Sequence, residues 1–175
     1  MTRQTVIAYW LVPSEPAHSF FQGIINDFAR RYDAPVFEPH VTVYVGADRA
    51  DAAENALEEA ARKCKLTALT TIGIDQSDKF IKTLFVRFAM TAQLGKINGI
   101  IRHAANDSSQ YELKPHLSLL YKNLPAATRS ELAASITLPF SEIPFDSLQA
   151  IRCVSPTQKR ADVEAWEVVA SKILR

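Results

Sequence analysis

The segment PHVTV at residues 39–43 recurs 76 residues later as PHLSL at residues 115–119. In both copies a proline precedes a histidine, and a hydroxyl residue, Thr42 or Ser118, follows two positions after that histidine. Alternating polar and apolar residues predict a β-strand, and a proline is tolerated where a strand begins. Side chains two positions apart share one face of a strand. Each copy is therefore expected to present a histidine and a hydroxyl on the same face.

The same displacement of 76 residues relates longer stretches of the chain. It carries the strand-like run 6–12 onto 82–88, and it carries the helical pattern of residues 21–29 onto 97–105. We therefore predict an internal repeat, at about residues 5–74 and 81–150, with the order strand, helix, strand, helix, strand. The stretches that complete this order are residues 51–63 and 66–74 in the first copy and residues 126–135 and 142–150 in the second, and a last strand at about 163–173 stands outside the repeat.

The repeat predicts an α+β fold made of two lobes. Each lobe is expected to be an antiparallel sheet with outer helices, and a pseudo-twofold axis should relate the two lobes around a central cleft. No linker rich in glycine, serine or proline separates the copies, so the lobes are expected to share a sheet or to pack closely. Residues 1–175 are accordingly expected to form a single bilobal catalytic domain.

Composition narrows the function classes further. The chain has 175 residues, 47% of them hydrophobic, and a formal net charge of +1, which argues against binding long nucleic acids mainly through their phosphates. Cys64 and Cys153 are far apart and form no CxxC pair, which favours free thiols and a cytoplasmic location. The uncharged stretch at residues 4–14 is too short to span a bilayer, so no membrane partner is expected.

Two histidine–hydroxyl pairs that face each other suit chemistry at a phosphorus atom. In-line displacement needs a base beside the entering oxygen and an acid beside the leaving oxygen, and histidine, with an ordinary pKa of ~6.5, serves in either role. The hydroxyls of Thr42 and Ser118 would donate to the non-bridging oxygens, where charge develops. The strain of a cyclic phosphodiester suits a site without a metal. The sequence also lacks HExxH, GxxxxGK[ST], GxGxxG and GxSxG, so no metal and no cofactor are expected.

A structural role for the two histidines remains the alternative interpretation, because a histidine on a strand is often only a hydrogen-bonded structural residue. The other histidines of the chain offer a comparison. Neither His18 nor His103 has a preceding proline or a hydroxyl two positions later, and both are interpreted as residues of helix surfaces or ends.

The paired motifs resemble the signatures of the two-histidine (2H) phosphoesterase superfamily. Within it, the chain is most similar to the cyclic phosphodiesterases, which open nucleoside 2',3'-cyclic phosphates and ADP-ribose 1'',2''-cyclic phosphate. The resemblance extends to WLVP at residues 10–13 and to the spacing of His116, Ser118 and Tyr121. It covers the length and element order of essentially the whole chain.

The resemblance implies roles for six residues. His40 and His116 would be the catalytic pair, with His116 activating the attacking water and His40 protonating the departing ribose oxygen. The other four would bind substrate: Thr42 and Ser118 at the phosphate, and Trp10 and Tyr121 at the base or the phosphate. Each of these aromatic residues could equally belong to the core. Simple alternation places Tyr121 on the opposite strand face from Ser118, so its role requires a bulge or the end of the strand.

The function expected from residues and resemblance together is metal-free hydrolysis of a small cyclic phosphodiester. One alternative is a 2H enzyme, or a ligase-like relative, that acts on RNA ends, and another is a nucleotide-binding protein without turnover. The expected partner is a small cyclic nucleotide, or in the RNA alternative an RNA end, and a monomer is favoured. The RNA alternative needs a basic stripe that leads to the cleft, for which the candidates are Lys79, Lys82, Arg87, Lys114 and Lys122.

Overall fold

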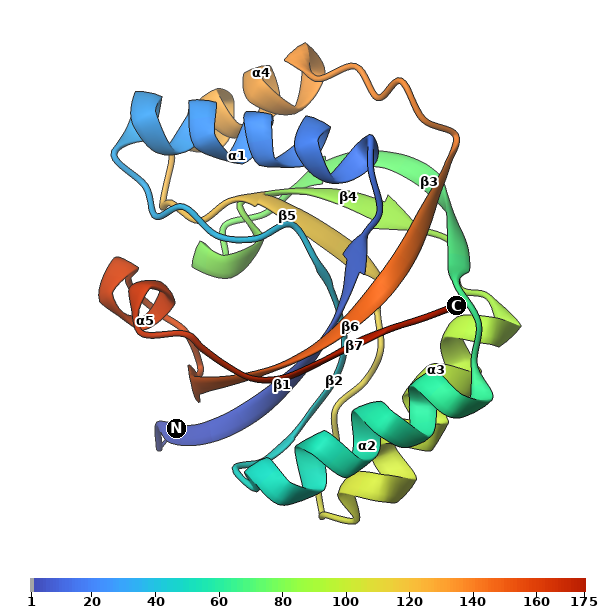
Figure 1. The fold of residues 1–175 in the computed structure, drawn as a ribbon. Helices are drawn as coiled ribbons and strands as arrows, with labels where there is room; N and C mark the ends of the chain where they lie inside the picture. The colour runs from blue at the N-terminus through green and yellow to red at the C-terminus, as the bar shows by residue number, and fades with distance from the viewer. Residues whose placement is uncertain (1) are drawn as a thin grey trace.

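The computed structural model describes residues 2–175 and consists of seven strands, five α-helices and one short 3₁₀ helix (Figure 1). The strands are β1 (Gln4–Pro13), β2 (Val41–Ala47), β3 (Thr67–Gln76), β4 (Leu84–Phe88), β5 (His116–Leu120), β6 (Glu142–Ser155) and β7 (Glu167–Ile173). The helices are α1 (Ala17–Tyr32), α2 (Ala50–Lys63), α3 (Ala92–Ala105), α4 (Ala126–Ser135) and α5 (Arg160–Glu164), with the 3₁₀ helix η1 at Phe80–Lys82.

The periodicity of apolar residues explains why these segments fold as they do. In β5, Leu117 and Leu119 are fully buried in the main core, whereas the alternate residues His116 and Ser118 face away from it. In the helices the buried residues recur at helical spacing, which gives each helix one apolar face toward the sheet. The predicted α+β class is therefore confirmed.

All strand pairs are antiparallel, and the seven strands form one sheet in the order β1-β2-β5-β4-β3-β6-β7. β1 also pairs with β6, so six of the strands close into a ring. The long strand β6 makes this closure, because residues 142–145 pair with β3 and residues 145–155 pair with β1.

The two lobes do not coincide with the two copies of the repeat. The third strand of each copy crosses to the other lobe: β3 pairs with β4, the first strand of the second copy, and β6 pairs with β1, the first strand of the first copy. The helices follow the same exchange. α1 and α4 lie on one side of the molecule and α2 and α3 on the opposite side, so each lobe takes one helix from each copy (Figure 1). The halves of the chain are thus interlocked.

The structure corrects the predicted last strand at 163–173, because its first residues form the short helix α5 and the strand begins at Glu167. The carboxylate of Asp162 accepts hydrogen bonds from the backbone N–H groups of Gln158 and Lys159, which fixes the turn that starts this helix. Val163 is buried in a small cluster with Ile25, Phe37 and Tyr121 instead of extending a strand. Likewise, the predicted strand at 82–88 begins at Leu84, after η1.

None of the helices within residues 2–175 combines the length and the apolar character needed to cross a membrane.

Candidate functional site

The contact between β2 and β5 positions the site. It consists of one residue pair, Val41 with Leu117, and these two residues are equivalent in the repeat because they are 76 positions apart. The pseudo-twofold axis therefore passes through this pair, whose side chains are fully buried in the core. The residues on either side of the pair project from the opposite face. Because the strands are antiparallel, His40 lies on the Ser118 side of the axis and Thr42 on the His116 side.

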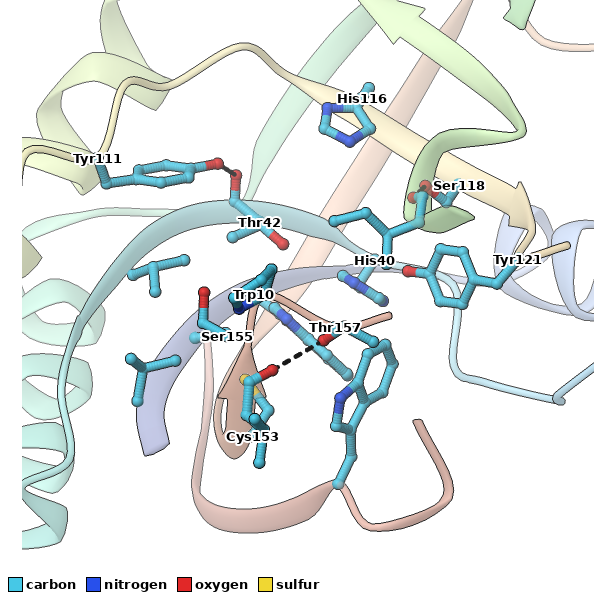
Figure 2. Close-up of a pocket in the computed structure, with 17 residues that line it drawn as sticks. Trp10, His40, Thr42, Tyr111, His116, Ser118, Tyr121, Cys153, Ser155 and Thr157 are labelled. Carbon is cyan, nitrogen blue, oxygen red and sulfur yellow. Dashed lines mark hydrogen bonds between the residues drawn. The ribbon is translucent and has the colours of Figure 1, made fainter. Parts of the chain in front are cut away.

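The four motif residues line one cavity with a volume of about 250 Å³. Figure 2 shows His40, Thr42, His116 and Ser118 arranged around a common space, with the two imidazoles at opposite ends. Trp10 and Tyr121 line the same cavity. The structure thus brings together all six of the residues that the sequence singled out.

Both imidazoles are held by the same backbone contact. The Nδ1 atom of His40 lies 2.6 Å from the carbonyl oxygen of Glu38, and the Nδ1 atom of His116 lies 2.7 Å from the carbonyl oxygen of Lys114. A carbonyl oxygen only accepts hydrogen bonds, so Nδ1 carries the hydrogen in each ring. The Nε2 atom of each ring is therefore the one left to exchange protons with a ligand.

His40 stands in an aromatic enclosure. Its ring stacks on Trp10, with the ring centres 3.6 Å apart and the planes 10° from parallel. The ring of Trp166 meets the His40 ring edge-on, and these two ring centres are 6.0 Å apart. Only 6% of His40 is exposed. This burial, with a smaller contribution from nearby His116, lowers the pKa of His40 to about 3, so its ring is neutral at pH 7.

His116 is less enclosed and stands next to positive charge. Its ring meets Phe85 edge-on at 5.6 Å, whereas His40 lies flat against Trp10. Burial lowers the pKa of His116, and the ammonium group of Lys82 lowers it further. Both imidazoles are thus prepared as neutral bases, and a bound anion would favour the protonated form of either.

The two hydroxyl residues differ in their present partners. The Ser118 hydroxyl donates a hydrogen bond of 2.9 Å to the carbonyl oxygen of Ile81, on η1. Thr42 is fixed through its backbone, because its carbonyl oxygen accepts a hydrogen bond of 3.2 Å from the Tyr111 hydroxyl. Both side chains reach the cavity (Figure 2). Hydroxyls placed between two imidazoles are suited to bind the oxygens of a phosphate group.

The structure clarifies the two aromatic candidates. Trp10 is almost fully buried and one face of its ring is covered by His40, so it orients and encloses that histidine. Tyr121 follows directly after the last residue of β5, Leu120. The end of the strand frees Tyr121 from the alternation that would have turned it away from Ser118, and its ring stacks on Phe37 at 4.0 Å. Burial raises the pKa of its hydroxyl.

Several cavity residues carry no signal in the sequence. Cys153 reaches the cavity because β6 pairs with β1, where Cys153 is opposite Val6. Burial raises the pKa of its thiol to about 11, so the thiol is protonated at neutral pH. Trp166 enters from the connection between α5 and β7. No spacing in the sequence relates these residues to the histidine motifs. The same is true of three further polar residues that line the cavity, Tyr111, Ser155 and Thr157.

The described part of the chain, residues 2–175, contains no group of three or more His, Cys, Asp or Glu side chains arranged to hold a metal ion. Cys64 and Cys153 are both free.

Comparisons with known proteins place the chain among its relatives. The sequence matches the family described as cyclic phosphodiesterase-like protein over residues 5–174. A cyclic phosphodiesterase from Arabidopsis thaliana is 26% identical over 172 residues, which cover 96% of this chain and 94% of that protein.

Solved structures share the fold. E. coli LigT, in its complex with 3'-AMP, superposes with a TM-score of 0.59 at 13% identity, covering 99% of both chains. TT0787 of Thermus thermophilus superposes with a TM-score of 0.59 at 15% identity, covering 97% of this chain and 98% of that one. The family match spans nearly the whole sequence and the described fold agrees with it. The chain therefore belongs to the cyclic phosphodiesterase-like family of the 2H phosphoesterases and is a phosphodiesterase.

Proposed function

We propose that this protein hydrolyses a small cyclic phosphodiester, a nucleoside 2',3'-cyclic phosphate or ADP-ribose 1'',2''-cyclic phosphate, without a metal. One observation carries the proposal: two imidazoles and two hydroxyls, related by the pseudo-twofold axis, surround one cavity with each Nε2 free to exchange a proton. This geometry suits a single phosphorus atom attacked on one side and released on the other.

The proposed reaction moves two protons, one on each side of the phosphorus atom. A water oxygen attacks phosphorus while Nε2 of His116 takes its proton. The bond between phosphorus and one ribose oxygen breaks, and Nε2 of His40 gives that oxygen a proton. The hydroxyls of Thr42 and Ser118 donate to the non-bridging oxygens as their charge grows, and Ser118 gives up its hydrogen bond to the Ile81 carbonyl oxygen to do so. The product is a phosphomonoester, and the two histidines exchange protons with solvent before the next turnover.

This direction follows the resemblance to the family, and it needs a neutral His116 and a protonated His40, although burial lowers the pKa of His40 to about 3. His116 is the less enclosed of the two, and the nearby Lys82 ammonium favours its neutral form, which a base requires. His40 is enclosed by Trp10 and Trp166, where the ribose of a bound nucleoside would remain after the bond breaks. Its imidazolium form is stabilised only when the phosphate anion is bound, so proton donation is coupled to substrate binding.

The nature of the substrate rests on the walls of the cavity and on the relatives. A volume of about 250 Å³ with aromatic and small apolar walls suits a nucleoside-sized ligand. The Arabidopsis relative is named a cyclic phosphodiesterase, and the E. coli protein of the same fold was solved with 3'-AMP. A cyclic nucleotide is consistent with both.

The proposal is tested by incubating the protein with the four 2',3'-cyclic mononucleotides and ADP-ribose cyclic phosphate in the presence of a chelator. Phosphorus NMR should show a phosphomonoester product, and His40→Ala and His116→Ala should each lower kcat by about 10²–10⁴-fold. Activity that disappears with chelator and returns with a divalent ion would overturn the metal-free mechanism. Unchanged turnover in both variants would instead indicate that the histidines are structural.

The direction of proton transfer has its own test, a cyclic phosphorothiolate whose departing bridging atom is sulfur. A thiolate leaves without help from an acid, so His40→Ala should recover most of its lost activity on this substrate, whereas His116→Ala should not. Rescue of His116→Ala alone would reverse the two roles.

The RNA-end alternative depends on a continuous basic stripe. The cavity is lined by none of the candidates, Lys79, Lys82, Arg87, Lys114 and Lys122. The Lys122 ammonium instead donates to the carbonyl oxygen of Asp33 and lines a separate depression with Arg160. A steep salt dependence of oligonucleotide binding would favour this alternative. Cyclic nucleotide binding without turnover by the wild-type protein would favour the non-catalytic one.

A further inference from the structure

The carbonyl group that holds the His40 ring lies in a segment without regular secondary structure. Residues 34–40 connect α1 to β2 and belong to neither element. The Glu38 carbonyl oxygen, 2.6 Å from Nδ1 of His40, is therefore not placed by the hydrogen bonds of a helix or a sheet. Pro39 disfavours a helical backbone conformation at Glu38. Other contacts are needed to fix where this carbonyl lies.

Two side chains of α1 make such contacts. The Nε2 atom of Gln22 donates a hydrogen bond of 3.1 Å to the carbonyl oxygen of Phe37. The Nε2 atom of His18 lies 3.2 Å from Oε1 of Glu38. A carboxylate only accepts hydrogen bonds, so Nε2 of His18 carries the hydrogen. Because residues four positions apart share one face of a helix, both bonds reach the segment from the same side of α1.

Both contacts are themselves anchored. The ring of Phe37 is buried and stacks on Tyr121, with the ring centres 4.0 Å apart. On the other side of His18, a carboxylate oxygen of Glu15 lies 3.7 Å from Nδ1. The same carboxylate accepts a hydrogen bond of 2.8 Å from the Ser19 hydroxyl. The segment before the first catalytic histidine is thus held through both its aromatic and its acidic side chain.

The corresponding segment of the second copy is held differently. The His116 ring bonds to the carbonyl oxygen of Lys114, the residue equivalent to Glu38 in the repeat. Here the anchor is a backbone bond, because the Phe88 N–H donates to the Pro115 carbonyl oxygen at 3.1 Å. The Lys114 side chain lies 3.6 Å from Glu112 in an exposed pair, and pairs of this kind are weak.

The helix of the second copy does not repeat the contacts of α1. The α3 residues equivalent to His18 and Gln22 are Leu94 and Asn98. Leu94 is buried in the main core, and the Asn98 amide donates to the Val43 carbonyl oxygen at 2.6 Å. Side chains of a helix therefore hold the acceptor of His40, whereas a backbone bond next to Lys114 holds the acceptor of His116.

We propose that His18 and Gln22 are positioning residues. They hold the Glu38 carbonyl, so that the His40 ring keeps its hydrogen on Nδ1 and presents Nε2 to the departing ribose oxygen. The proposal rests on the proposed function, in which His40 is the acid. Both residues lie outside the cavity and act through Glu38. Partly exposed pairs such as His18–Glu38 contribute little to stability, so their loss is expected to change the orientation of His40.

The test compares the wild type with His18→Ala/Gln22→Ala, in which alanine preserves the helix. On the cyclic nucleotide that the wild type hydrolyses fastest, kcat should fall by about ten-fold or more, because a small displacement of a reacting group is costly. KM should stay unchanged. His18→Gln, whose amide can still donate to the Glu38 carboxylate, should keep most of the wild-type kcat. Glu112→Ala, the matched control before His116, should keep all of it.

A second measurement separates positioning from a purely structural role. Nitrogen NMR of the imidazoles at pH 7 distinguishes the ring nitrogen that carries the hydrogen from the one that does not. In the wild type, Nδ1 should carry it in both His40 and His116. In the double variant the two nitrogens of His40 should become more alike, because the ring then samples both tautomers, whereas those of His116 should be unchanged.

The outcomes are distinct. An unchanged kcat, a loss confined to KM, or an unchanged tautomer of His40 in the double variant would overturn the positioning role. An equally large loss of kcat in His18→Gln would overturn the part assigned to the His18–Glu38 bond. If the wild type hydrolyses no cyclic phosphate, the proposed function fails, but the NMR comparison needs no turnover and still decides whether α1 holds His40.

Discussion

At the scale of single residues, the two catalytic candidates share one restraint and differ in their surroundings. Each histidine uses Nδ1 to bind the carbonyl oxygen two residues before it, so each ring presents Nε2. His40 is stacked and enclosed, whereas His116 is next to cations. The neighbours thus differ although the motifs are alike, and because burial lowers the pKa of His40 to about 3, its proposed role as the acid depends on a bound anion that favours its protonated form.

The burial of His40 predicts how stability depends on pH. Its pKa is about 3 in the folded chain and ~6.5 when unfolded, so between these values the unfolded chain binds more protons. This contribution is fully present above pH ~6.5 and is lost as the pH falls toward 3. The free energy of unfolding should therefore decrease on acidification, with at most ~1.4 kcal/mol per pH unit from this one group.

Urea unfolding at several pH values between 7.5 and 4 measures this slope. His40→Gln should show a shallower dependence on pH than the wild type, and His103→Gln, on the exposed surface of α3, should retain the wild-type slope. Equal slopes in all three proteins would contradict the burial of a neutral imidazole at position 40.

At the scale of elements, the strand β2 needs a glycine at position 46, where the backbone lies close to the side chains of Asp107 and Tyr44. A Cβ atom at Gly46 would collide with the carboxylate of Asp107 and the ring of Tyr44. Asp107 accepts hydrogen bonds from the Tyr44 hydroxyl at 2.5 Å and from the Ala47 N–H at 2.8 Å, so it joins the chain after α3 to the end of β2.

Gly46→Ala is therefore expected to destabilise the protein by about 1–3 kcal/mol, the usual cost of overpacking. Gly23, in the middle of α1, provides the matched control because nothing lies within 4 Å of a Cβ built there. Gly23→Ala should stabilise by roughly 0.5–1 kcal/mol, since alanine is the better helix former. Thermal melting of the two variants checks both signs, and a neutral Gly46→Ala would contradict the close packing at Asp107.

The repeat explains which elements the sequence predicted well. The segments PHVTV and PHLSL predicted the strands β2 and β5. Because side chains two positions apart share one face of a strand, they also predicted that His40 faces the same side as Thr42, and His116 the same side as Ser118. Elements outside the repeat were harder to predict from the sequence. The helix α5 depends on the carboxylate of Asp162, a local hydrogen-bond pattern without hydrophobic periodicity. Trp166 and Cys153 reach the cavity only through the pairing of β6 with β1 and β7, which no single-sequence pattern specifies.

At the scale of the whole molecule, the exchange of β3 and β6 joins the two copies into one structure. Neither copy retains its own third strand beside its first, and each lobe contains a helix from the other copy. The lobes therefore cannot form separately, although the sequence divides into two similar halves.

Fragments 1–77 and 78–175 should accordingly be unfolded when each is produced alone, because each would hold only three of the six strands that form the closed ring. Far-ultraviolet circular dichroism and amide NMR dispersion would show this, and mixing or co-expressing the fragments should restore the folded signal. A stable, cooperative unfolding transition in either isolated fragment would contradict the interlocked fold.

The central claim is that two imidazoles, one from each copy, act on a single phosphorus atom. A crystal structure with inorganic phosphate or vanadate bound tests it most directly. We expect one anion on the pseudo-twofold axis, with oxygens within about 3.2 Å of Nε2 of both His40 and His116 and of the hydroxyls of Thr42 and Ser118. An anion that contacts only one of the two histidines, or that binds outside their shared cavity, would contradict the account.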